Sequence, residues 1–174
     1  MPVAVPTPHV GGPGQGADMF LHVQSAKTGK IKGESSVPGH IDDIQLSGWS
    51  WGLQAHTAMG STEVTSRRSY TGLTVYKQLD RASTGLMAAL VTNALIKEAK
   101  LTMRRAGGSQ LAFWVITLKD ARIVRVDHQT SADGGTIETV GINFTTVDIE
   151  YKQQQAGGLI GGGYTFSDQM MPAA

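Results

Sequence analysis

The chain has 174 residues, of which 40% are hydrophobic and 17% charged, and its formal net charge at pH 7 is +1. This length fits one domain with a full core, and the near-neutral charge gives no basic field for nucleic acid. The sequence contains no cysteine, which excludes disulfides and thiolate metal sites.

The two ends differ from the middle in composition. Residues 1–17 hold early prolines and a run of glycines, so we expect a flexible leader. The leader lacks a basic segment followed by an apolar run, so we expect no signal peptide and a cytoplasmic protein. The longest apolar run, residues 111–116, falls far short of the roughly 20 residues that cross a bilayer, so we expect no stable membrane insertion. Residues 156–174 form a glycine-rich tail with room for a short final strand.

Strand patterns dominate residues 18–155, the predicted folded domain. One helix is predicted after Ser83, where apolar residues recur at helical spacing. The apolar residues change face near residues 145–146, which a β-bulge would explain. We predict a mainly β fold, a closed antiparallel β-barrel with one α-helix over an opening or flank. The predicted strands cover residues 18–23, 41–53, 70–76, 99–104, 111–118, 122–129 and 137–151.

Two tryptophans, Trp49 and Trp51, lie one residue apart in the second predicted strand. Alternate side chains of a strand face the same side, so both indoles point one way and Ser50 the other. We predict that both belong to the structural core. Ser50 would then face a neighbouring subunit, the outside or a channel, and a small hydroxyl beside glycines leaves that surface low and wettable.

Residues 54–69 form a long polar connection, and loops above about 12 residues are usually functional or disordered. Arg67 and Arg68 lie at its end. They suit either ion pairs between subunits, with acidic partners such as Asp80 or Glu63, or solvated strand ends.

The groups with catalytic potential do not form a set. His40 precedes Asp42 and Asp43, but no third metal ligand or orienting partner lies nearby, so we interpret these as solvated turn residues. Asp127 and His128 are adjacent on a strand and point to opposite faces. The glycine runs lack the Lys-Ser/Thr that ends a phosphate loop. We expect no enzyme activity, cofactor or metal.

An ordered set of segments resembles the haemolysin-coregulated protein (Hcp) family, the tube subunits of bacterial type VI secretion, over roughly residues 18–166. The leader and the glycine-rich tail depart from the family pattern. The resemblance implies a homo-hexameric ring, stacked into a hollow inner tube that a contractile sheath expels. It also implies sheath, spike and effector partners, and secretion after a cytoplasmic stage. The segments are Ile31-Lys32-Gly33-Glu34-Ser35 and residues 42–52, 73–80, 99–108, 115–120 and 140–151.

The resemblance also implies roles for particular residues. The matching strand of the family lines the pore, so we expect Ser50 and Ser47 to face the lumen and contact cargo. The matching loop reaches toward the adjacent ring, which predicts a ring-stacking role for Thr57, Met59, Ser61, Glu63, Arg67 and Arg68.

A rival hypothesis is a monomeric β-barrel that binds a small ligand against the Trp pair. Such a carrier would have a mass near 18.4 kDa, whereas a hexameric ring would be far heavier.

Overall fold

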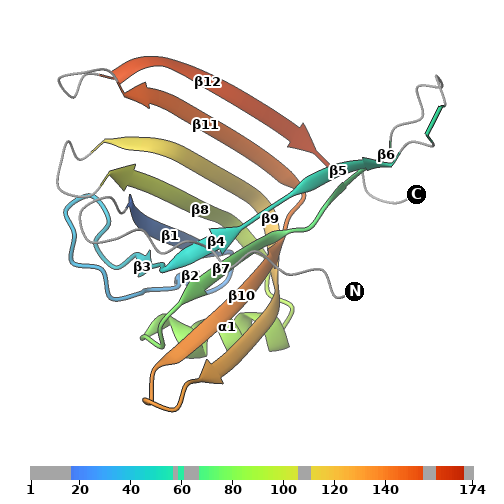
Figure 1. Ribbon diagram of the computed structural model, residues 1–174. Helices are drawn as coiled ribbons and strands as arrows, with labels where there is room; N and C mark the ends of the chain where they lie inside the picture. Colours follow the sequence, from blue (N-terminus) through green and yellow to red (C-terminus); the bar gives the residue numbers. More distant parts are fainter. Residues whose placement is uncertain (1–16, 57–58, 61–66, 106–110, 155–159, 171–174) are drawn as a thin grey trace.

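The computed structural model describes residues 17–56, 59–60, 67–105, 111–154 and 160–170, which form strands and one α-helix (Figure 1). The helix, α1 (Ala82–Val91), lies in the predicted region but begins before Ser83, with Arg81 as its N-cap residue. The strands are β1 (Ala17–Ser25), β2 (Gly29–Lys30), β3 (Ile44–Gln45), β4 (Gly48–Ser50), β5 (Leu53–His56), β6 (Arg67–Tyr70), β7 (Leu73–Lys77), β8 (Ile96–Arg105), β9 (Ala112–Thr130), β10 (Thr136–Asn143), β11 (Thr146–Gln154) and β12 (Ile160–Gln169).

Ten of the strands form one sheet, whose main path runs β2-β1-β8-β9-β10-β7-β4. The strand β11 pairs with the first half of β9, and β12 pairs with β11. Figure 1 shows these two strands extending from the body of the molecule beside β9. Strands β5 and β6 form a separate two-stranded sheet. The glycine-rich tail therefore carries a ten-residue strand of the main sheet, longer than the short strand that composition predicted.

The strand β9 joins the two parts of the sheet. The sequence predicted two strands here, but β9 runs unbroken for 19 residues. Its first half pairs with β8 and β11, and its second half with β10. Asp120 has a φ of 49°, a left-handed value that marks a sharp local turn of the backbone. The Thr145 hydroxyl donates to the Asp120 carbonyl at 3.0 Å. This hydrogen bond joins the β10–β11 connection to β9 at the turn.

The predicted β-bulge near residues 145–146 is wrong. Strand β10 ends at Asn143 and β11 begins at Thr146, and their partners on β9 are Arg122 and Lys119. Equal numbers of residues therefore lie on the two sides of the corner. The register shift lies instead between Gly141 and Ile142. Residues 144–145, where the apolar residues change face, lie outside both strands.

The ladders do not close the sheet into a barrel. They run from β2 at one end to β4 at the other, as an open path. One chain segment, residues 44–50, nevertheless touches both sides: β3 pairs with β1 and β4 pairs with β7. Between them the Leu46 amide donates to the Met19 carbonyl at 3.0 Å, and the Ser47 amide donates to the Tyr76 carbonyl at 2.8 Å. The fold is mainly β with one helix, as predicted.

The core lies between the inner face of the sheet and α1, which contributes Leu86 and Ala89. An ion pair that the sequence analysis missed lies at the start of the helix. Lys77 and Glu138 are 0% exposed, and their Nζ and Oε1 atoms are 2.5 Å apart. The Lys77 ammonium also contacts the Ser83 hydroxyl at 3.1 Å. Burial of such a charge is tolerated only while its partner is present.

The pKa of Glu138 reflects this pairing. Burial alone would raise the pKa of this carboxyl, but hydrogen bonds from Lys77 and His128 outweigh burial and hold it below its usual value of 4.5. A carboxyl with a lowered folded-state pKa contributes stability that is fully present above its unfolded pKa. That stability is lost as pH falls through the folded value.

We expect Lys77→Met to lower the free energy of unfolding by about 3–5 kcal/mol near neutral pH, because it leaves the buried Glu138 carboxylate with only the half-exposed His128 as a partner. The deficit should shrink as pH falls, because without Lys77 burial raises the pKa of Glu138 and the carboxyl takes up a proton and becomes neutral. Urea unfolding of both proteins at several pH values measures this. The exposed Lys100 provides the control, Lys100→Met, which should change stability by less than about 0.5 kcal/mol. An equal deficit at every pH would contradict the assignment.

Candidate functional site

The strand with the Trp pair separates two kinds of surface. Trp49 pairs with Val75 in the ladder and Ser50 with Thr74. Both indoles are half-buried and pack against the core, while Ser50 is exposed. The Trp49 Nε1 lies 3.2 Å from the Met103 sulfur. The indoles lie at the margin of the core because β4 ends the ladder path.

The outward face beside Ser50 carries small and hydroxyl groups. Ser50 lies opposite Thr74 of β7, which in turn lies opposite Gly141 of β10. Ser47 is exposed, and its hydroxyl donates to the Tyr76 carbonyl at 3.1 Å. The row is uncharged from Ser50 to Gly141, and the next position across the ladder is Arg125 of β9, whose exposed side chain pairs with Asp127.

The expected ring-stacking residues fall only partly within the described chain. Met59 is described and fully exposed. Thr57, Ser61 and Glu63 lie outside the described residues, and Arg67 begins β6. The hairpin of β5 and β6 extends from the end of β4, with every residue of β5 exposed (Figure 1).

Arg68 binds within its own chain. Its Nε lies 2.5 Å from Asp168 Oδ2 and its Nη2 lies 3.0 Å from Oδ1. The Tyr70 hydroxyl donates to the same carboxylate at 2.6 Å. Of the partners considered from sequence, Asp80 contacts Lys77 at 2.9 Å, and Glu63 lies outside the described residues. These contacts, which we call the Asp168 latch, tie the β5–β6 hairpin to β12.

Aromatic rings continue from the core onto the outer strands. Trp114, Tyr151 and Tyr164 lie in register across β9, β11 and β12. Their successive ring centroids are 6.5 and 6.3 Å apart, and Trp49 lies 6.5 Å from Trp114. A second row places Phe166 beside Ile149, which is buried.

The outer part of this face is uncovered. Tyr164 is 65% exposed, Phe166 43% and Tyr151 40%. These three residues, the β12 aromatic face, share the side of the sheet whose inner members Ile149 and Val147 are buried in the core. A large exposed apolar patch marks a contact site. The signal was present in the sequence, since Tyr164 and Phe166 alternate in the tail, but the glycines around them obscured it.

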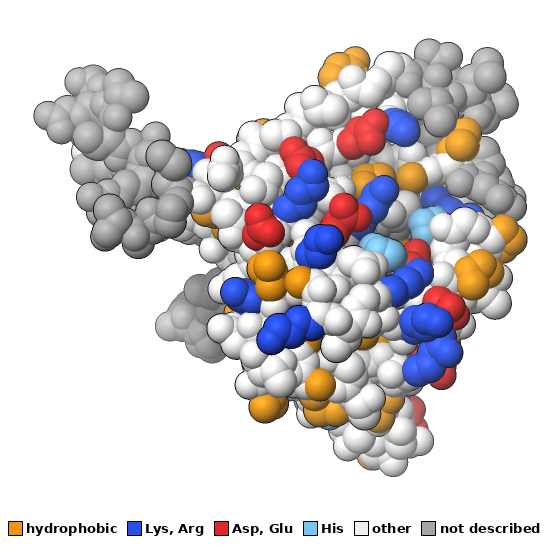
Figure 2. Space-filling model, turned by 180° about the vertical axis from the view of Figure 1, so that it is seen from behind, with side chains coloured by type: hydrophobic (Ala, Val, Ile, Leu, Met, Phe, Trp, Pro, Cys, Tyr) orange, Lys and Arg blue, Asp and Glu red, His pale blue; other side chains and the backbone are white. Residues whose placement is uncertain are grey.

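The face shown in Figure 2 is charged rather than aromatic. Lys and Arg side chains gather there among Asp and Glu, and hydrophobic side chains form only separate small patches. Mixed charge of this sort is typical of solvated protein surface.

The interpretation of His40, Asp42 and Asp43 as solvated turn residues is wrong for Asp43. Its carboxylate is buried and contacts His22 at 3.3 Å, Lys30 at 2.8 Å and His40 at 3.0 Å. Burial would raise the pKa of Asp43, but hydrogen bonds from Lys30 and the histidines hold it below its usual value. No cluster in the described part of the chain has the ligand set to hold a metal ion.

This cluster has a structural role. The His40 ring stacks on Phe20 with centroids 4.3 Å apart, and the Arg104 guanidinium lies 5.3 Å from the same ring. A Cβ at Gly33 would lie 2.5 Å from the Asp43 carbonyl oxygen, so only glycine fits there. The segment from residue 31 to 43 therefore covers the outer face of β1.

Comparisons with known proteins place the fold among type VI secretion system proteins. The family described as "Type VI secretion system effector, Hcp" matches residues 20–151. Protein hcp1 of Pseudomonas aeruginosa is 34% identical over 152 residues, which are 84% of this chain and 90% of that protein. The chain belongs to the Hcp family.

Solved structures share the fold. Hcp1 from Salmonella typhimurium superimposes with a TM-score of 0.72 at 29% identity, over 88% of this chain and 94% of that one. A structure described as a type six secretion system protein gives a TM-score of 0.79 at 22% identity, over 89% and 96% of the two chains. No helix among the described residues is both long and apolar enough for a membrane span.

The contacts of the Asp168 latch predict that Tyr70 has an unusually high pKa. Burial and the Asp168 carboxylate together raise the pKa of Tyr70 to about 12. We expect Asp168→Asn to lower this pKa toward the ordinary value of 10.0, because the carboxylate no longer opposes ionisation of the phenol. NMR titration of the Tyr70 ring measures the shift. Asp127→Asn, far from the latch in the ladder, is the control. An unchanged pKa in Asp168→Asn would show that the latch does not form in solution.

Proposed function

We propose that this chain is a structural subunit of the inner tube of a type VI secretion system. Subunits close into hexameric rings, and the rings stack into a hollow tube that is expelled and carries effectors in its lumen. Membership of the Hcp family supports this function. The uncovered β12 aromatic face is the observation that supports the proposed ring, because an exposed apolar face of this kind needs a partner surface.

A ring supplies that partner. In a head-to-tail ring each subunit offers one surface and receives another, so the β12 aromatic face of each chain packs on the next. Within each subunit the ladder path is open, and residues 44–50 bridge its two sides, because they are hydrogen-bonded to β1 at one end and to β7 at the other. Its role is structural, without catalysis, cofactor or metal.

The rival reading, a monomeric ligand carrier, is not supported. A ligand would need space against the Trp pair. The side chains that face inward there belong to one packed cluster that includes Val75, Leu101 and Val140, each 0% exposed. The family match points to secretion rather than to ligand transport.

Native mass spectrometry tests the ring. We expect a hexamer of 18.4 kDa chains. Phe166→Lys should dissociate it, because a charge would be buried at the contact of each subunit with the next. Thr165→Lys is the matched control: Thr165 is exposed, and its neighbour position places it on the opposite face of the same strand. It should leave the hexamer intact. A wild-type monomer at micromolar concentration, or equal loss in both variants, would contradict the proposed interface.

The lumen wall is assigned to the outward face of β4 at Ser50 and to Ser47, which directly precedes the strand. Both side chains are exposed, and the small uncharged groups around them suit a channel through which cargo passes. The partners proposed for the assembled tube are its own stacked rings and the sheath, spike and effector proteins of the machine. The protein is cytoplasmic before firing and secreted afterwards.

A single cysteine tests this wall, since the native chain has none. We expect Ser50→Cys to react with small and bulky thiol reagents in dissociated subunits. In assembled tubes it should react only with reagents narrow enough to enter the pore. Mass spectrometry of the labelled chain reads the result. Free labelling by bulky reagents in tubes would place Ser50 on the outer wall.

Stacking is assigned to the loop that β5 and β6 carry, with Thr57, Met59, Ser61, Glu63, Arg67 and Arg68 as its residues. The Asp168 latch supports this arrangement, because it fixes the base of the hairpin to β12. Anchoring the base reduces the conformational entropy that the loop loses on docking. On this proposal the loop makes the contact between rings, and the β12 aromatic face makes the contact within a ring.

A further inference from the structure

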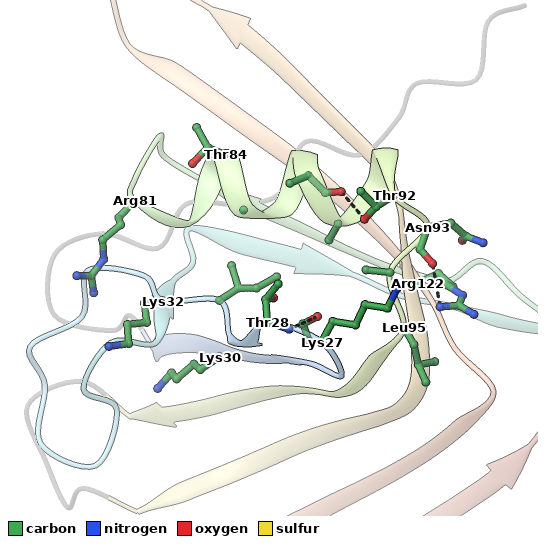
Figure 3. A pocket seen from close by; sticks show the side chains of 16 residues that line it. Lys27, Thr28, Lys30, Lys32, Arg81, Thr84, Thr92, Asn93, Leu95 and Arg122 are labelled. Carbon is green, nitrogen blue, oxygen red and sulfur yellow. Dashed lines mark hydrogen bonds between the residues drawn. The ribbon is translucent and has the colours of Figure 1, made fainter.

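A groove of about 730 Å³ lies between α1 and the turn that joins β1 to β2 (Figure 3). Ile31, Ala88 and Leu95 contribute apolar side chains to its lining. Around them stand five cationic side chains, and none of the lining residues is acidic: Lys27, Lys30, Lys32, Arg81 and Arg122. A cavity of this size is in the range that holds a specific ligand.

Among the described residues, no carboxylate pairs with three of these cations. Lys30 pairs with Asp43, and Arg81 pairs with Asp42. Within the described part of the chain, Lys27 and Lys32 form no ion pair, and Arg122 donates to the Asn93 backbone carbonyl at 3.0 Å. Unpaired cations collected at one cavity favour an anionic partner.

The helix wall of the groove is neutral and lined by small residues. The sequence of α1, ASTGLMAALV, has no charged side chain. Thr84 and Ala88 of α1, and the C-cap residue Thr92, line the groove. Small side chains allow the main chain of a ligand to approach closely, and the threonine hydroxyls add hydrogen-bonding capacity.

The cations gather at two ends. Figure 3 shows Arg81, Lys32 and Lys30 toward the start of α1, and Lys27 and Arg122 toward its end. The hydrogen bond from Arg122 to Asn93, just beyond the helix, agrees with this view. Ten helical residues span about 15 Å, a distance that about five residues of extended peptide would cover.

We propose that this groove binds an acidic peptide segment of a partner protein, with carboxylates at both ends and apolar residues between them. The carboxylates would contact Lys32 at one end and Lys27 and Arg122 at the other. The apolar residues would pack on Ile31 and Ala88. A single small anion would contact one end only and leave the apolar lining uncovered. All the residues that line the groove belong to one chain, so its binding can be tested separately from ring formation.

Fluorescence anisotropy of the full chain with a labelled peptide, Glu-Glu-Leu-Ala-Leu-Glu-Glu, tests the proposal. We expect saturable binding that weakens with added salt. Lys32→Ala and Arg122→Ala should each weaken binding by about two- to fivefold, the usual range for a single exposed ion pair. Loss from both single variants would show that the two ends are used together.

Two controls match the two parts of the site. Lys100→Ala removes an exposed cation outside the groove and should leave binding unchanged. A peptide with Gly-Ser-Gly in place of Leu-Ala-Leu keeps the charges and should bind more weakly, because it buries no apolar surface. Equal binding of both peptides, or equal loss in Lys100→Ala, would show non-specific attraction and overturn the proposal.

Three further outcomes distinguish a peptide site from a small-anion site and from a contact between subunits. Full displacement of the peptide by millimolar inorganic phosphate would indicate a small-anion site and overturn the peptide assignment. If Lys32→Ala and Arg122→Ala instead changed the mass of the assembled ring, a second copy of the chain would occupy the groove. A normal hexamer with the predicted loss of peptide binding would support the groove independently of the tube.

Discussion

The strand β9 is the constraint on which the rest of the structure depends. It pairs with β8 and β11 along its first half and with β10 along its second. Because one continuous backbone serves both parts, the turn at Asp120 sets the angle between them. The segment between β10 and β11, residues 144–145, follows that turn and is held by the hydrogen bond from Thr145 to Asp120. The side of β9 that faces the core then stays on the same side along β11 and β12.

That continuity explains the exposed aromatic face. A sheet that extends beyond its own core carries its apolar side with it, and Tyr164 and Phe166 lie where no layer of the described chain covers them. A monomer would leave this area in water, whereas a neighbouring subunit would bury it. The proposed assembly depends on the length of β11 and β12 as much as on the chemistry of any residue. The Asp168 latch adds the β5–β6 hairpin to the same edge, so the proposed contacts within and between rings are mechanically connected.

Charge is distributed in two ways in this near-neutral chain. Some charges are enclosed and satisfied, as in the Lys77–Glu138 pair under α1 and the Asp43 cluster on β1. These interactions hold segments in place. Others have no ion-pair partner among the described residues: Lys27, Lys32 and Arg122 gather beside a helix that carries no charge of its own. Net charge conceals this separation, because it sums over the whole surface.

The sequence by itself determined the features that depend on local periodicity. Alternation separated Ser50 from Trp49 and Trp51, helical spacing located α1, and the ordered motifs identified the family. The tertiary structure alone decided the partners that are distant in sequence. Arg68 meets Asp168, 100 residues away, and Lys77 meets Glu138, 61 residues away. Periodicity states which face a side chain takes but not which strand lies beside it. That choice depends on the bend of β9 and the pairing of β12, because only the folded sheet brings those side chains together.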